Sequence, residues 1–116
     1  MSDKIQCLKI KLRPNSLDKV RNWAKFLNSN QKEVLESLVN EAVQIEAFFL
    51  SKDTDADYLI YFFKVQNADL MKKTSDSSDL SVDIYTRKFK AEVIESREEL
   101  ELLAGFGQVG KFDSKI

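Results

Sequence analysis

Lysine and glutamate side chains at regular spacing are the groups in this sequence best suited to binding a small charged molecule. Lys9 and Lys11 alternate with apolar residues, which places both on one face of a strand. Glu46 and Glu101 lie in two other alternating segments and are expected to oppose these lysines across a sheet. Such a cluster would bind a small polar or anionic ligand. The alternative is that the charges are solvated or form ion pairs across a dimer interface.

Three further polar residues are candidates for ligand contact or proton transfer. Tyr61 lies in a run that is apolar on both faces, so its hydroxyl reaches a ligand or is satisfied within the core. Asp83 opens an amphipathic helical segment. If the protein is an enzyme, Glu46, Tyr61 and Asp83 are the side chains we expect to move a proton, since carboxylates and phenols act as general acids and bases.

Residue types that are absent exclude several kinds of chemistry. The chain has no histidine and a single cysteine. Because histidine is the commonest metal ligand and the usual general base near neutral pH, His-ligated metal or haem sites and Ser-His or Cys-His nucleophiles are excluded. Cys7 has no basic helix terminus beside it and no intrachain disulfide partner. We therefore expect neither a metal ion nor a cofactor.

Charge and hydropathy limit the expected partners and location. Eighteen basic residues against nineteen acidic ones give a formal charge of -1, with no positive excess to attract nucleic acid or an anionic membrane. No stretch approaches the roughly 20 apolar residues of a membrane span, and the start lacks the apolar core of a signal peptide. We expect a cytoplasmic protein that binds neither nucleic acid nor membrane.

Hydrophobic periodicity predicts four strands and four helical segments. Alternation indicates strands over 8–13, 43–50, 58–63 and 100–106, and spacing of three to four residues indicates helices over 17–27, 34–42 and 82–96. A short helix capped by Asn67 precedes a polar loop over 75–81. In the second strand, strict alternation separates two faces: Val43, Ile45, Ala47 and Phe49 on one, and Gln44, Glu46, Phe48 and Leu50 on the other.

This order of elements predicts an α+β domain of the ferredoxin-like βαββαβ type, with helices on one face of a four-stranded antiparallel sheet. We expect the domain to span residues 1–106 and a tail, 107–116, to form a loose arm or short edge strand. The run Tyr58–Phe63 is hydrophobic on both faces, so the open sheet face needs a cover. We expect a homodimer formed through that face. The alternative is partial shielding by the tail.

Four phrases resemble a family of small uncharacterised proteins related to the dimeric α/β-barrel superfamily. They are LKIKLRPNSLDKVRNW, VQIEAFFL, DYLIYFFKV and DLSVDIYTRKF, within residues 8–106. The resemblance implies a pocket between sheet and helices. The wider superfamily includes cofactor-free monooxygenases, haem-degrading enzymes, sugar mutarotases and lactone isomerases. The family pattern carries histidines where this chain has Leu80 and Thr86 around Asp83, so a histidine-dependent function is lost here or performed differently.

The leading hypothesis is a homodimeric binding module, rather than an enzyme, that holds a small polar or anionic ligand between sheet and helices. One alternative is a cofactor-independent enzyme of the same fold, an isomerase or a monooxygenase. A regulatory domain that binds an amino acid is the other. The sequence does not identify the ligand, nor which face of the third strand lines the cleft.

Overall fold

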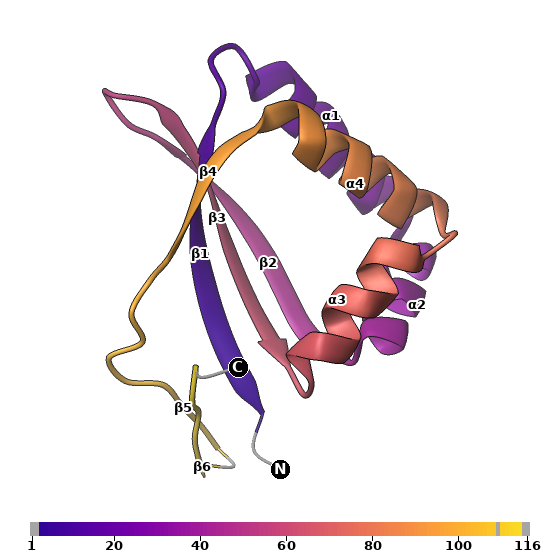
Figure 1. Ribbon diagram of the computed structural model, residues 1–116, viewed down its shortest axis with the longest axis vertical. Coiled ribbons are helices and arrows are strands. Elements are labelled where there is room, and N and C mark those ends of the chain that lie inside the picture. Colours follow the sequence, from indigo (N-terminus) through magenta and orange to yellow (C-terminus); the bar gives the residue numbers. More distant parts are fainter. Residues whose placement is uncertain (1–2, 109, 115–116) are drawn as a thin grey trace.

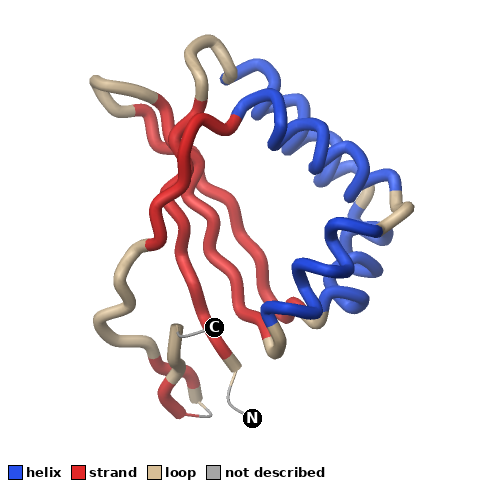
Figure 2. Tube along the Cα trace, in the orientation of Figure 1, coloured by secondary structure: helices blue, strands red, loops and turns tan. Residues whose placement is uncertain are grey.

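Four helices lie on one face of a four-stranded antiparallel sheet (Figures 1 and 2), which confirms the predicted α+β class. The computed structural model describes residues 3–108 and 110–114. Within them, no helix is long and apolar enough to span a membrane. In chain order the elements are β1 (Lys4–Leu12), α1 (Leu17–Ser29), α2 (Gln31–Glu41), β2 (Val43–Lys52), β3 (Asp57–Val65), α3 (Ala68–Ser77), α4 (Ser81–Val93), β4 (Ile94–Glu99), β5 (Phe106–Gly107) and β6 (Gly110–Lys111).

The strands of the main sheet follow the order β2-β3-β1-β4, so the strand that is apolar on both faces is central. Leu8 of β1 and Phe48 of β2 both pair with Tyr61 of β3, which puts these three side chains in one row facing the helices. Further along the same face, Leu59 and Phe63 are almost fully buried. This face of β3 forms the floor of the core.

Trp23 of α1 joins the helices to the sheet and is 1% exposed. Its indole stacks on Phe89 of α4 with ring centroids 4.4 Å apart and meets the ring of Phe48 edge-on at 4.7 Å. Its Nε1–H donates a 2.9 Å hydrogen bond to Oγ1 of Thr86. A buried tryptophan needs such an acceptor because an unsatisfied N–H is costly away from water.

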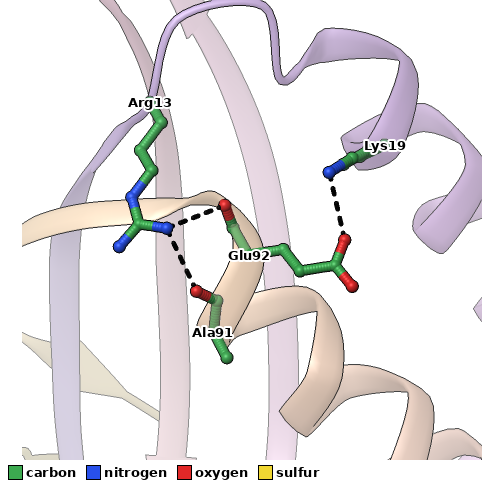
Figure 3. A network of polar contacts seen from close by, with 4 residues as sticks. All are labelled: Arg13, Lys19, Ala91 and Glu92. Atoms are coloured by element: carbon green, nitrogen blue, oxygen red, sulfur yellow. Dashed lines mark hydrogen bonds and ion pairs between the residues drawn. The ribbon is translucent and has the colours of Figure 1, made fainter.

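Arg13, directly after β1, binds the C-terminal end of α4 (Figure 3). Its Nη1 donates to the carbonyl oxygens of Ala91 and Glu92 at 3.2 and 3.1 Å. A cation at this end interacts favourably with the helix dipole and satisfies carbonyls that have no partner within the helix. The Glu92 carboxylate also pairs with Lys19 of α1 at 3.1 Å. These contacts fix the ends of α1 and α4 near the start of β4.

A β-bulge in β2 corrects the predicted alternation of its side chains. The register with β3 shifts between Val43 and Ile45, so Gln44 is an extra residue on the bulged strand. Val43 is consequently buried, whereas Ile45 and Phe49 are 50% and 61% exposed on the outer face. The predicted grouping of Val43 with Ile45 and Phe49 is therefore wrong, because the bulge turns Val43 to the helix side, where Glu46 also lies.

The prediction of a last strand over 100–106 is wrong. The chain leaves α4 at Val93 and enters β4 at once, ending at Glu99. This edge strand is polar and mostly exposed, and it is defined by backbone pairing with β1 rather than by an apolar pattern. The predicted helix over 82–96 is accordingly three residues too long at its end. The predicted polar loop is shorter than expected, because α3 continues to Ser77.

The C-terminal segment covers one end of the outer sheet face. The backbone N–H of Ile5 donates to the carbonyl of Asp113 at 2.9 Å, and the Lys64 ammonium lies 4.8 Å from the centre of the Phe112 ring. Strands β5 and β6 pair with each other within this segment. Of the predicted domain and tail, residues 1–2, 109 and 115–116 lie outside the described residues. Phe49, on the outer face of the edge strand β2, is 61% exposed.

Candidate functional site

A cavity of about 260 Å³ lies between the helices and the inner face of β2 and β3. Apolar side chains reach it from all four helices and the sheet, while ionisable and hydroxyl groups converge from α2, α3, α4 and the sheet. Close-packed domains normally fill such a position with apolar side chains. The lining residues are Trp23, Leu27, Val34, Ser37, Glu41, Glu46, Phe48, Tyr61, Met71, Lys72, Ser75, Asp76, Val82, Asp83, Thr86 and Lys90.

Asp83, in the first turn of α4, ties three helical segments together at the rim of this cavity. Its Oδ1 accepts a 2.7 Å hydrogen bond from the buried Ser37 hydroxyl of α2. Its Oδ2 accepts a 2.5 Å bond from the hydroxyl of Ser78, in the loop that links α3 to α4. A carboxylate at a helix N-terminus is also stabilised by the helix dipole. Asp83 therefore has a clear structural role in addition to lining the cavity.

Two other residues strengthen the same junction. Glu33 of α2 accepts hydrogen bonds from the Ser81 hydroxyl at 2.6 Å and the Val82 N–H at 2.8 Å, and so caps α4 from a neighbouring helix. These donors lower the pKa of Glu33. Arg87 of α4 donates to the carbonyls of Ser75 and Ser78 at the end of α3. Helices α2, α3 and α4 are thus joined by charged groups.

Glu46 and Tyr61 form a hydrogen-bonded pair on the floor of the cavity. The Tyr61 hydroxyl donates to Oε1 of Glu46 at 2.8 Å, and its ring stacks on Phe48 with centroids 4.4 Å apart. Burial raises the pKa of Glu46, although the Tyr61 bond and the Lys90 charge act in the opposite direction. Burial and the Glu46 carboxylate raise the pKa of Tyr61. This tyrosine consequently stays protonated and acts as a donor.

Glu41, the last residue of α2, is only 8% exposed and carries the largest perturbation among the acids of the cavity. Burial, followed by the charges of Asp83 and Glu46, raises the pKa of Glu41 from its ordinary value near 4.5 to about 7. The next residue, Ala42, has a left-handed φ of 57° and turns the chain directly into β2. That turn brings Glu41 and Glu46 to the same cavity although they lie on different elements.

Lys90 is the cation that α4 contributes to the cavity. Burial lowers its pKa, while the charges of Glu46 and Glu41 act to raise it. Desolvation therefore outweighs attraction to the acids, as expected where geometry does not allow close pairing. Among the described residues, the ion pairs within 4.0 Å include none between Lys90 and either glutamate. The cavity thus holds charges of both signs in a partly dehydrated setting.

The chemistry open to this arrangement is hydrogen bonding, charge recognition and proton transfer. Raised pKa values are typical of carboxyl groups that work as acids and bases in closed sites. In the described ranges, no group of three or more acidic or cysteine side chains is placed to hold a metal ion. Glu46, Tyr61 and Glu41 are the groups that present acceptors or donors for a small molecule.

The structure brings three of the six predicted site residues together and places the other three elsewhere. Glu46, Tyr61 and Asp83 line the cavity. On the outer sheet face, Lys9 lies over the Tyr58 ring at 4.4 Å and Lys11 pairs with Glu95 at 3.2 Å. Glu101 is exposed in the segment that follows β4. No cluster of Lys9 and Lys11 with Glu46 exists, because they lie on opposite faces of the sheet.

Sequence reasoning missed Glu41, Lys90 and Ser37, although a spacing signal for them exists. Ser37 and Glu41 are four residues apart, on the helix face that also carries Val34. Asp83, Thr86 and Lys90 repeat the same pattern on α4. Polar residues at helical spacing normally mark the solvent-facing side of a helix, so this pattern alone does not place them in the interior. Only the fold shows that the two stripes meet.

Comparison with known protein families matches residues 3–109 to a family described as a family of unknown function (DUF6176). The matched range spans all four strands of the main sheet and all four helices that the structure describes. No curated protein matches the chain.

The burial of Glu41 predicts a specific dependence of stability on pH. Because its pKa is raised on folding, the folded state binds more protons than the unfolded state between about pH 4.5 and pH 7, and stability falls as pH rises through that window. At about 1.4 kcal/mol per pKa unit, the loss is roughly 3 kcal/mol. Glu41→Gln should remove it, as measured by urea unfolding at pH 5 and pH 8.

The control is Glu36→Gln, a substitution of an exposed glutamate on the same helix. We expect this variant to lose stability between pH 5 and pH 8 just as the parent does. Equal losses for Glu41→Gln and the parent protein would show that Glu41 ionises at its ordinary pKa, and would contradict the description of the site.

Proposed function

The chain belongs to the DUF6176 family, whose function is unknown, and we propose that it is a module that binds a small polar molecule in the cavity beneath α2, α3 and α4. The observation that carries this proposal is the convergence of Glu41, Glu46 and Tyr61 on one cavity. Burying carboxyl groups destabilises a fold unless they are well paired. Glu41 is kept buried with a pKa near 7, which is consistent with selection for a site rather than for packing.

The size and lining of the cavity favour a small ligand with both polar and apolar parts. Benzene fits a cavity of roughly 150 Å³, and drug-sized ligands occupy about 300–1,000 Å³. A volume of about 260 Å³ therefore suits a metabolite of modest size. Trp23, Phe48 and Met71 offer apolar contact, while the carboxyl and hydroxyl groups would fix its orientation.

The anionic ligand considered from sequence loses its main support. That hypothesis rested on Lys9 and Lys11, whose side chains lie on the outer sheet face. In the cavity the acids Glu41, Glu46, Asp76 and Asp83 outnumber the bases Lys72 and Lys90. An additional negative charge would be repelled by this lining.

A cofactor-independent isomerase is the second candidate, and one observation favours it. The pKa of Glu41 near 7 suits a general base or acid at neutral pH, where the efficiency of proton transfer is greatest. Glu46, which accepts a hydrogen bond from Tyr61, would supply the second group. Conversion of a bound compound, rather than its unchanged recovery, distinguishes this candidate from a binding module.

We also propose that the domain is ferredoxin-like and dimerises through its outer sheet face, as in dimeric α/β barrels. The strand order β2-β3-β1-β4, with helices on one face, supports the first part. The outer face of β2 presents Ile45 and Phe49, which are 50% and 61% exposed. The outer sheet face also carries both charge signs, in Lys11 of β1 and Glu95 of β4. In a dimer with two-fold symmetry, this surface would be buried against the same surface of the second copy.

Occupancy of the cavity is tested with a matched pair of substitutions on α2. Val34 lines the cavity, whereas Val39 is 78% exposed on the same helix. A ligand at one hundred times its Kd stabilises a protein by about 2.7 kcal/mol, so a panel of small sugars, acids, amines and alcohols should contain compounds that raise Tm. We expect Val34→Phe to abolish those shifts by filling the cavity, and Val39→Phe to retain them.

Retention of every shift by Val34→Phe would place binding elsewhere and contradict the proposal. Compounds that raise Tm are then incubated with the protein and followed by NMR. Unchanged spectra support the binding module. Conversion that Glu46→Gln abolishes supports the isomerase.

Dimerisation is tested by sedimentation velocity at micromolar concentration. We expect the parent protein to sediment as a dimer and Phe49→Lys as a monomer, because a charge at this exposed position on the outer face of β2 would be desolvated in the interface. Val39→Lys, on an exposed helical position away from the sheet, should leave the dimer intact. A monomeric parent protein would refute this part of the proposal.

A further inference from the structure

We propose that the cavity is specific for a small organic cation, a molecule of a few carbon atoms that carries a primary ammonium group held between Glu41 and Glu46. This inference rests on the proposed binding function and names the class of ligand. It is carried by the balance of charge around the cavity and by the hydrogen bonds already made there. It also rests on the finding that, among the described residues, no three acidic or cysteine side chains are grouped to bind a metal ion.

The side chains that line the cavity include more acids than bases, and Lys90 only partly offsets the charges of Glu41 and Glu46. Four of its ionisable side chains are acidic and two are lysines. The ion pairs within 4.0 Å among the described residues do not include Glu41 or Glu46. An ammonium ion would meet this excess directly, whereas a carboxylate or phosphate would add to it.

Existing hydrogen bonds indicate which acids are available to a ligand. Both oxygens of Asp83 already accept serine hydroxyls, so Asp83 is committed to holding the helices. Glu46 accepts the Tyr61 hydroxyl on one oxygen, and a carboxylate has about four acceptor positions in all. Glu41 interacts with the Ser75 hydroxyl and has the same spare capacity. An ammonium group has three donors and no acceptor, which matches this set.

The geometry favours an organic cation over a metal ion. Through the part of the chain that the structure describes, no three acidic side chains are grouped to coordinate a metal. The remaining wall is apolar and aromatic, with Trp23, Phe48 and Met71. Methylene groups attached to an ammonium would pack against it, as lysine stems do on apolar surfaces. A bare or hydrated metal ion would leave this wall unused.

The proton on Glu41 competes with such a cation. Burial and the neighbouring acids raise the pKa of Glu41 to about 7, so near neutral pH the carboxyl is partly protonated and ligand binding must release that proton. The charged or titratable groups that face Glu41 come from every adjoining element: Glu46 on β2, Tyr61 on β3, Lys72 and Asp76 on α3, and Asp83 and Lys90 on α4. For one site of pKa 7, linkage gives a roughly tenfold weaker affinity at pH 6 than at pH 8.

The test compares three molecules of nearly equal size, ethanolamine, glycolate and ethylene glycol, by thermal shift and calorimetric titration of the full chain. We expect ethanolamine to raise Tm and to bind about tenfold more tightly at pH 8 than at pH 6. Glycolate and ethylene glycol should have little effect. Glu41→Gln and Glu46→Gln should each weaken ethanolamine binding at least tenfold, and Glu36→Gln, outside the cavity, should leave it unchanged.

If glycolate or ethylene glycol raises Tm while ethanolamine does not, the cation preference is refuted. The proposed binding function would still hold. If none of the three molecules binds, the cation proposal is refuted. The binding function itself is refuted only if no compound of the wider panel raises Tm either. An ethanolamine affinity that does not change between pH 6 and pH 8 would overturn the assignment to Glu41, even if a substituted variant proves too unstable to assay.

Discussion

The carboxylates of Asp83 and Glu33 hold three helices in one arrangement, and the rest of the site depends on them. Asp83 accepts hydroxyls from α2 and from the α3–α4 loop, and Glu33 reaches across from α2 to cap α4. These bonds connect helices to each other rather than to the sheet. Apolar packing therefore does not fill the whole space between these helices and the sheet, and a polar cavity lies over β2 and β3. Figure 1 shows α2 and α3 facing one end of the sheet, while α1 and α4 face the other.

The layer between helices and sheet contains both buried apolar clusters and a polar cavity. Around Trp23, the rings of Phe48 and Phe89 pack closely with Ile10, Leu12 and Val93, which form an apolar core. In the cavity, Glu41 and Glu46 are removed from water with incomplete charge compensation. Buried, unpaired acids reduce stability, and proteins commonly tolerate that loss where a site requires it. The apolar clusters stabilise the fold, and the polar cavity is where we place its function.

Sequence periodicity was sufficient to predict those elements that bury only one of their faces. The alternation in β1 and the stripe on α1 place Leu8 and Trp23 correctly. In β3, which is apolar on both faces, the pattern did not show which face lines the cleft, and only its pairing with β2 puts Tyr61 on the helix side with Glu46. The edge strand β4 could not be found this way, because it is polar and is defined by pairing with β1. Nor could the bulge at Gln44, since an extra residue in a strand leaves no mark in composition.

Residue type alone pointed to part of the cavity lining. Glu46, Tyr61 and Asp83 line the cavity, whereas Lys9 and Lys11 lie on the face of β1 opposite Leu8 and Ile10, as predicted, and that face points away from the cleft between sheet and helices. Glu41 carries no local signal of its perturbation, because its pKa depends on Glu46 and Asp83, which reach it only through the fold. Desolvation is a property of the assembled layers and is not encoded in any one segment.

The central claim is that the cavity is partly dehydrated and negatively charged around Glu41. Its most direct test is carbon-13 NMR of the glutamate carboxyl groups across a pH titration, with the Glu41 resonance assigned by its loss in Glu41→Gln. We expect this carboxyl to titrate with a pKa of about 7. A pKa near 4.5, the ordinary value for a solvated glutamate, would contradict it.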